Sequence, residues 1–145
     1  MEVLSKSPED TAKIAQQILE SNDHSVIALS GDLGSGKTVF TQGLGKALGV
    51  ERSITSPTFL LLKAYATTHN VFNKLIHIDL YRVLGWDDIS ELALSELWSN
   101  PKNLVVIEWA ERIADYLPEQ TLWIHIESVD ENTRLIRTSA LVDDK

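Results

Sequence analysis

The chain has 145 residues, 43% of them hydrophobic, and no cysteine, so we expect one domain over residues 1–145 without disulfides or thiolate metal sites. Its formal net charge of −8 at pH 7 argues against a broad basic surface for nucleic acid. No apolar run approaches the roughly 18 residues that a membrane helix needs, and the N-terminal residues lack the pattern of a secretory signal, so we expect a cytoplasmic protein.

The first expected element is an amphipathic helix over residues 7–21, SPEDTAKIAQQILES. Ser7 and Asp10 have the spacing of a capping box at its start, and Pro8 suits the first turn. Three apolar residues of this segment share one helical face and are expected core residues: Ile14, Ile18 and Leu19.

A short apolar strand is expected over residues 25–30, followed by a glycine-rich loop and a helix over residues 38–49. The further expected strands are apolar or alternating segments bounded by turn residues: 58–67, 74–81, 103–110, 121–128 and 134–141. A second amphipathic helix is expected over residues 86–99, with four core residues: Ile89, Leu92, Leu94 and Leu97. A short helix is expected over residues 111–118. This order of strands and helices predicts an α/β fold.

The most specific pattern in the chain is GDLGSGKT at residues 31–38. It fits the phosphate-loop pattern G-x-x-x-x-G-K-[ST], with an expected strand before it and an expected helix after it. Glycines allow successive backbone N–H groups to face phosphate oxygens, and the helix presents its positive end to the same anion. This context disfavours the alternative, a glycine-rich turn that contains a lysine by chance.

The loop assigns nucleotide-binding roles to individual residues. Lys37 is expected to reach the β and γ phosphates, and Thr38 is expected to give its hydroxyl to Mg²⁺, which proteins bind with few side-chain oxygens besides phosphates and water. The full set of expected nucleotide-binding residues in the loop is Gly31, Asp32, Leu33, Gly34, Ser35, Gly36, Lys37 and Thr38.

Two acidic residues end apolar strands, Asp79 in LIHIDLYR and Glu108 in LVVIEWAER. Either carboxylate can bind magnesium or one of its waters, or orient the attacking water. Alternatively, each is a helix cap or an ion-pair partner. Trp109, which follows Glu108, shields the site, stacks on a partner or packs on the core, and packing is the more common role of such a tryptophan.

These residues resemble the TsaE or YjeE family of small bacterial P-loop ATPases, which take part in making threonylcarbamoyladenosine on tRNA. Four segments carry the resemblance, in family order and spacing: GDLGSGKT (31–38), TSPTF (55–59), HIDLYR (77–82) and IEWAER (107–112). The resemblance implies a P-loop NTPase fold with a central mixed β-sheet flanked by helices. It also implies ATP and Mg²⁺ as cofactors.

The resemblance further implies that Glu108 is the acidic magnesium ligand beside Thr38, and that Asp79 is needed for hydrolysis. A switch-like segment near the γ-phosphate is matched by four residues, Thr55, Ser56, Pro57 and Thr58, although SPTF by itself predicts only a rigid turn. Three further positions match switch-related or partner-related residues: Tyr81, Arg82 and Trp109. Arg134 lies where such proteins approach the adenine. Val39 departs from many relatives, which have a second threonine there.

By this resemblance, ATP hydrolysis drives or resets a complex in which TsaD and TsaB modify adenosine in tRNAs that read ANN codons. The tRNA is expected to be contacted through the assembled complex, which suits an acidic chain.

Three alternatives remain at the level of the sequence. A small-molecule kinase uses the same loop, but the five arginines do not cluster into a lid. A GTP switch is disfavoured because NKLI at 73–76 lacks the aspartate of N-K-x-D and DLYR at 79–82 lacks the glycine of D-x-x-G. In a non-hydrolysing nucleotide-dependent scaffold, Asp79 and Glu108 would be superfluous.

Overall fold

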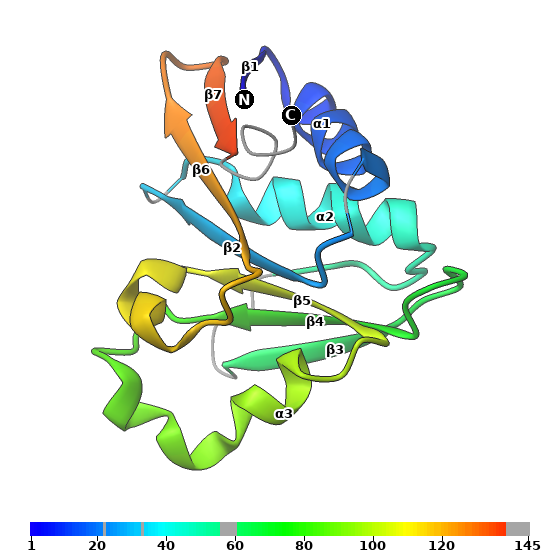
Figure 1. Cartoon of the computed structure of the whole chain (residues 1–145). Coiled ribbons are helices and arrows are strands. Elements are labelled where there is room, and N and C mark those ends of the chain that lie inside the picture. Colours follow the sequence, from blue (N-terminus) through cyan, green and yellow to red (C-terminus); the bar gives the residue numbers. More distant parts are fainter. Residues whose placement is uncertain (22, 33, 56–60, 139–145) are drawn as a thin grey trace.

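The structure is a computed structural model that describes residues 1–21, 23–32, 34–55 and 61–138. One sheet of seven described strands runs through the molecule in the order β1-β7-β6-β2-β5-β4-β3 (Figure 1). The strands are β1 (Glu2–Ser5), β2 (Val26–Gly31), β3 (Leu62–Ala66), β4 (Lys74–Asp79), β5 (Asn103–Glu108), β6 (Leu122–Ser128) and β7 (Arg134–Thr138). The helices are α1 (Pro8–Ser21), α2 (Lys37–Leu48) and α3 (Leu94–Trp98), with 3₁₀ turns η1 (Trp86–Asp88), η2 (Ser90–Leu92) and η3 (Ala110–Tyr116).

The sheet is mixed, which confirms the expected fold class. Its central strands β6, β2, β5 and β4 are parallel to one another, whereas β3, β7 and β1 join the sheet through antiparallel pairings. Because the four central strands run in one direction, their carboxyl ends lie at the same edge of the sheet.

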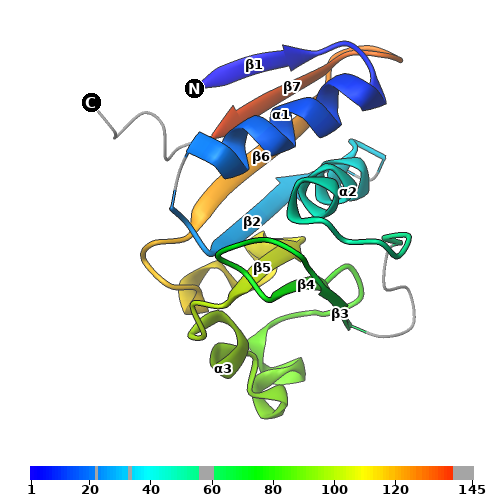
Figure 2. The same ribbon diagram turned by 90° about the vertical axis from the view of Figure 1, so that its right-hand side faces the viewer.

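Helices α1 and α2 lie together on one face of the sheet (Figure 2). Their apolar side chains pack on alternate residues of the strands, which include Leu29 and Val106. Gly43 permits close contact between the two helices, because a Cβ there would lie 2.6 Å from the Ala12 Cα. The other face of β2, β5 and β4 is covered by α3 and the 3₁₀ turns.

Helix α1 begins as the sequence predicts. The Ser7 Oγ accepts a hydrogen bond from the Asp10 N–H at 3.0 Å, and the Asp10 carboxylate accepts one from the Lys6 N–H at 3.1 Å. The first bond satisfies a backbone donor of the first helical turn, and the second ties the residue before the cap to the helix in place of the Ser7 N–H that a capping box would use. The expected core residues Ile14, Ile18 and Leu19 are buried.

The prediction of one continuous helix over residues 86–99 is wrong. The segment forms η1, η2 and the short helix α3, and the chain reverses at Ala93, which has a left-handed φ of 53°. Ile89 and Leu94 are five positions apart and would face different sides of a continuous helix, but the break allows both to be buried. Leu92, an expected core residue, is instead 52% exposed, and Leu97 is half-buried.

Other boundaries differ by smaller amounts. Strand β5 stops at Glu108 because Trp109 has a left-handed backbone, and the expected helix at 111–118 is the 3₁₀ segment η3, interrupted at Ile113. Strand β1 was not expected, since its four residues pair with β7 at the far end of the chain. The parts of the expected strands at 58–60 and 139–141 lie outside the described residues. Among the helices that the structure describes, none is long and apolar enough to cross a membrane.

Candidate nucleotide-binding site

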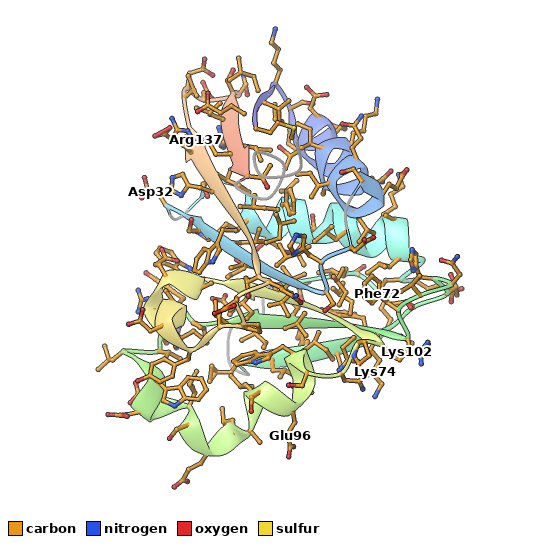
Figure 3. The ribbon with its side chains drawn as sticks, viewed as in Figure 1. Asp32, Phe72, Lys74, Glu96, Lys102 and Arg137 are labelled. Atoms are coloured by element: carbon orange, nitrogen blue, oxygen red, sulfur yellow. The ribbon has the colours of Figure 1, made fainter. Side chains whose placement is uncertain are left out.

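The candidate site lies at the carboxyl edge of the parallel strands, where β2 ends and α2 begins. Figure 3 shows Asp32, which follows β2, at the opposite end of the molecule from Lys74 and Lys102, which mark the amino ends of β4 and β5. Asp79 and Glu108 end β4 and β5 and stand opposite each other in the register. The topology therefore brings the glycine loop and both strand-end acids to one edge, as the sequence predicts.

The loop needs its glycines for two different reasons. Gly31 has a φ of 144°, and a Cβ there would lie 2.2 Å from the Ile126 carbonyl oxygen, so the loop passes too close to β6 for a side chain. Gly36 has a left-handed φ of 106° directly before α2, whereas the space around it is open. The backbone thus turns sharply into the helix, and the positive end of α2 faces the loop.

The Lys37 side chain is folded back onto the loop and is only 5% exposed. Its ammonium donates hydrogen bonds to the carbonyl oxygens of Gly31, at 2.5 Å, and Asp32, at 3.1 Å. It also lies 4.1 Å from the centroid of the Trp109 ring, within the range of a cation–π contact. These partners are neutral, so the positive charge remains available to a phosphate.

Burial lowers the pKa of the Lys37 ammonium below its usual value, because the charged form loses hydration. Nearby carboxylates oppose this shift and favour the charged form: those of Glu108, Glu111, Asp79 and Asp32. The buried cation therefore costs the ligand-free fold free energy that a bound anion would offset.

Glu108 is 3% exposed and lies between the loop helix and strand β4. Its Oε2 accepts a hydrogen bond from the Thr38 hydroxyl at 3.4 Å, and the Nε2 of His77 lies 2.5 Å from the same oxygen. A hydroxyl and a carboxylate in contact at the start of α2 are two ligands of the kind that Mg²⁺ prefers. The residues present thus fit the cation that the sequence resemblance implies, with phosphates and water left to complete its coordination.

Asp79 lies one strand further from the loop than Glu108, because β5 separates β4 from β2. It is half-buried, and its Oδ1 accepts a hydrogen bond from the Tyr81 N–H at 3.0 Å. Its carboxylate therefore shapes the turn that leaves β4 and also faces the edge that carries the loop.

Trp109 has a left-handed φ of 61°, which is rare for a bulky residue and marks a conformation that its surroundings enforce. Its ring stacks on Tyr81 at a centroid distance of 5.3 Å, and the Arg112 guanidinium lies 5.2 Å from it. Arg112 in turn donates a hydrogen bond to the Val83 carbonyl at 2.7 Å. The indole is therefore in contact with the phosphate-loop lysine as well as with the segment after β4.

Arg134, at the start of β7, holds the outside of the glycine loop. Its guanidinium donates to the carbonyl oxygens of Ser35, at 3.0 Å, and Gly34, at 3.4 Å, and also to that of Asp130, at 2.9 Å. These bonds tie the loop to β7 through its carbonyl oxygens, while the Ser35 N–H is bonded within the loop to the Asp32 carbonyl at 3.0 Å. The expected approach of Arg134 to an adenine stays a prediction.

The remaining expected residues are only partly described. The exposed Thr55 accepts a hydrogen bond from the Lys63 ammonium at 2.8 Å, and Arg82 is exposed. Four expected site residues lie outside the described part of the chain: Leu33, Ser56, Pro57 and Thr58. The Ser35 Oγ is buried in the loop and has no hydrogen-bond partner among the described residues, which leaves one polar atom there for a ligand to satisfy.

A protein-family model described as "Threonylcarbamoyl adenosine biosynthesis protein TsaE" matches residues 5–136 of the chain. The chain belongs to the TsaE family. The tRNA threonylcarbamoyladenosine biosynthesis protein TsaE of Aquifex aeolicus (strain VF5) is 40% identical over 139 residues, which cover 94% of this chain and 93% of the relative. The protein of the same name from Treponema pallidum (strain Nichols) is 37% identical over 139 residues, covering 94% and 98%. The crystal structure of Bacillus subtilus YdiB matches with a TM-score of 0.75 and 31% identity, covering 94% of this chain and 82% of that one.

Two residues that contact the site in this member of the TsaE family, His77 and Arg112, were not among the residues expected from the sequence. His77 lies two residues before Asp79 in strand β4. Side chains two residues apart in a strand point to the same face, and here that is the face that carries α2. This spacing was the available signal. Arg112 has no comparable signal, because its contacts with Trp109 and Val83 depend on the left-handed turn and on η3.

Proposed function

We propose that this protein binds ATP with Mg²⁺ and hydrolyses it, as a component of the system that makes threonylcarbamoyladenosine on tRNA. Its proposed partners are TsaD and TsaB, which modify the adenosine, and the tRNA is contacted through their complex. Hydrolysis supports repeated cycles of that complex. The proposal includes a cytoplasmic location, which follows from the tRNA substrate.

The observation that carries the proposal is the convergence of three groups at the start of α2. The glycine loop and the helix end supply N–H donors, Lys37 supplies a buried cation held by neutral partners, and Thr38 contacts Glu108. Together they provide donors for phosphate oxygens on one side and oxygen ligands for a cation on the other.

In this proposal the chain mainly binds, orients and neutralises charge. The loop amides and Lys37 hold the phosphates, and charge-assisted hydrogen bonds from the ammonium strengthen as negative charge develops on the transferred group. Thr38 and Glu108 hold Mg²⁺, which supplies further neutralisation of the phosphate charge. Asp79, one strand away, acts on hydrolysis with less effect on nucleotide binding.

The test is a reconstituted modification reaction with TsaD, TsaB, tRNA and either ATP or GTP. With ATP, the parent chain should support many cycles of adenosine modification, whereas Glu108→Gln and Asp79→Asn should associate with the partners but fail to sustain cycling. Glu96→Gln is the matched control, because Glu96 is an exposed residue of α3 and projects away from the sheet (Figure 3). Sustained cycling by both site variants would contradict the proposal, and equal support by GTP would favour a GTP switch instead.

A further inference from the structure

We infer that His77 is a positioning residue for Glu108: its ring holds the carboxylate oxygen that faces Thr38, and thereby fixes the cation side of the site. The inference rests on the proposed function, since it assigns His77 a part in magnesium binding.

The contact is unusually well isolated from solvent. His77 lies in the middle of β4 with 0% of its surface exposed, and its Nε2 is 2.5 Å from the Glu108 Oε2. Its other ring nitrogen, Nδ1, is buried and has no hydrogen-bond partner within the described part of the chain. The ring is therefore oriented through Nε2, which donates to the carboxylate.

A histidine at this position is difficult to explain by packing alone. On its own face of the sheet His77 follows Leu75, and in the parallel register it stands beside Val106; both are buried and aliphatic. An aliphatic side chain there would fill the space without an unpaired buried nitrogen, which carries a desolvation cost. The hydrogen bond from His77 to Glu108 offsets the desolvation cost of the buried ring nitrogen.

The two hydrogen bonds at Glu108 converge on one oxygen. Oε2 accepts from the Thr38 hydroxyl on one side and from His77 on the other, so the carboxylate is held against α2. Without the ring, the carboxylate can rotate about its last bond and lose this alignment. Partners that orient metal ligands in this way are commonly worth about 10- to 100-fold in metal affinity.

The test compares two variants of His77 by calorimetric titration of a non-hydrolysable ATP analogue, once with Mg²⁺ and once with EDTA. His77→Leu keeps an apolar side chain but has no donor, whereas His77→Gln offers an amide N–H at a similar reach. His125→Leu is the control, because His125 is an exposed histidine on strand β6, which β2 and β5 separate from β4. Thermal unfolding without nucleotide shows how far each variant keeps the fold.

The inference predicts that Mg²⁺ increases the nucleotide affinity of His77→Leu about 10- to 100-fold less than it increases that of the parent. The affinity of the variant for the nucleotide in EDTA should stay close to that of the parent. His77→Gln should recover most of the affinity gained from Mg²⁺, and the KM of His77→Leu for ATP with Mg²⁺ should rise in step with the lost affinity. An unchanged Mg²⁺ effect in His77→Leu, or equal losses with Mg²⁺ and with EDTA, would overturn the inference. If His77→Leu does not fold, a His77→Gln variant without any Mg²⁺ effect would overturn it. A parent chain whose nucleotide affinity ignores Mg²⁺ would overturn the proposed function as well.

Discussion

Replacing Lys37 by methionine tests two effects of the buried ammonium separately: its effect on the stability of the ligand-free fold and its effect on nucleotide affinity. Methionine retains a long, flexible apolar side chain but removes the ammonium, which donates to the carbonyls of Gly31 and Asp32 and lies on the Trp109 ring. A hydrogen bond from a charged group is worth about 1.5–3 kcal/mol, so the affinity for ATP with Mg²⁺ should fall about 10- to 150-fold. The ligand-free fold should lose little stability, because a poorly hydrated charge disappears together with its hydrogen bonds.

The pH dependence of stability has a defined sign. Because burial lowers the pKa of Lys37 below its ordinary value of 10.5, the unfolded chain binds more protons than the folded chain between the lowered pKa and 10.5. The parent therefore gains stability as the pH rises through this window, whereas Lys37→Met lacks this contribution. The stability of the variant relative to the parent should be highest below the window and should decline as the pH rises through it.

Two measurements check this prediction, namely calorimetric titration with the ATP analogue and thermal unfolding without nucleotide at neutral and alkaline pH. Lys46→Met is the matched control, because Lys46 is exposed on the same helix and should leave nucleotide affinity unchanged. Parent-like affinity in Lys37→Met would refute the assignment of the lysine to the phosphates. A relative stability that rises with pH in the alkaline window would refute the account of the buried cation.

Three further substitutions test other parts of the site. Glu108→Gln should lower ATP hydrolysis on the order of a hundredfold or more, with a modest loss of binding, as measured by phosphate release and titration. Arg134→Gln should weaken ATP binding several-fold without loss of the fold, because the loop carbonyls lose a charged donor; unchanged affinity would contradict this role. Gly31→Ala should destabilise the fold more than Gly34→Ala in denaturant titrations, since a Cβ at Gly31 meets backbone at 2.2 Å and one at Gly34 meets open space; the reverse order would contradict the packing argument.

The parts of the fold that sequence predicts are those specified locally. The Ser7 cap of α1, the buried strands and the turn from Gly34 into α2 each follow from spacing within a short segment, and all three are found in the structure. The prediction of a helix at 86–99 is wrong. The apolar spacing of this segment indicates a helix, but the core contacts of Ile89 and Leu94 require a chain reversal between them.

In the site, too, some features are specified by short sequence motifs and others depend on contacts between distant parts of the chain. The strand order brings Glu108 to the loop; the residue pattern alone left Asp79 and Glu108 as equal candidates, and the family resemblance implied the pairing of Glu108 with Thr38. The hold of Arg134 on the loop carbonyls was not predictable, because 99 residues separate it from Ser35 and only the pairing of β7 with β6 brings them together. The spacing of His77 and Asp79 indicates that both lie on one face of the strand, but the contact of His77 with Glu108 also depends on the register of β4 and β5, which this spacing does not specify.

The most direct test of the central claim is the release of inorganic phosphate from ATP with Mg²⁺, measured in the presence of TsaD and TsaB. The parent chain should release phosphate at a rate that rises when the partners are added, because such enzymes often complete their catalytic groups in a complex. Lys37→Met should release little, since its contact with the phosphates is lost. Equal rates for the two chains, or no release by the parent with its partners present, would contradict the claim that ATP is hydrolysed at this loop.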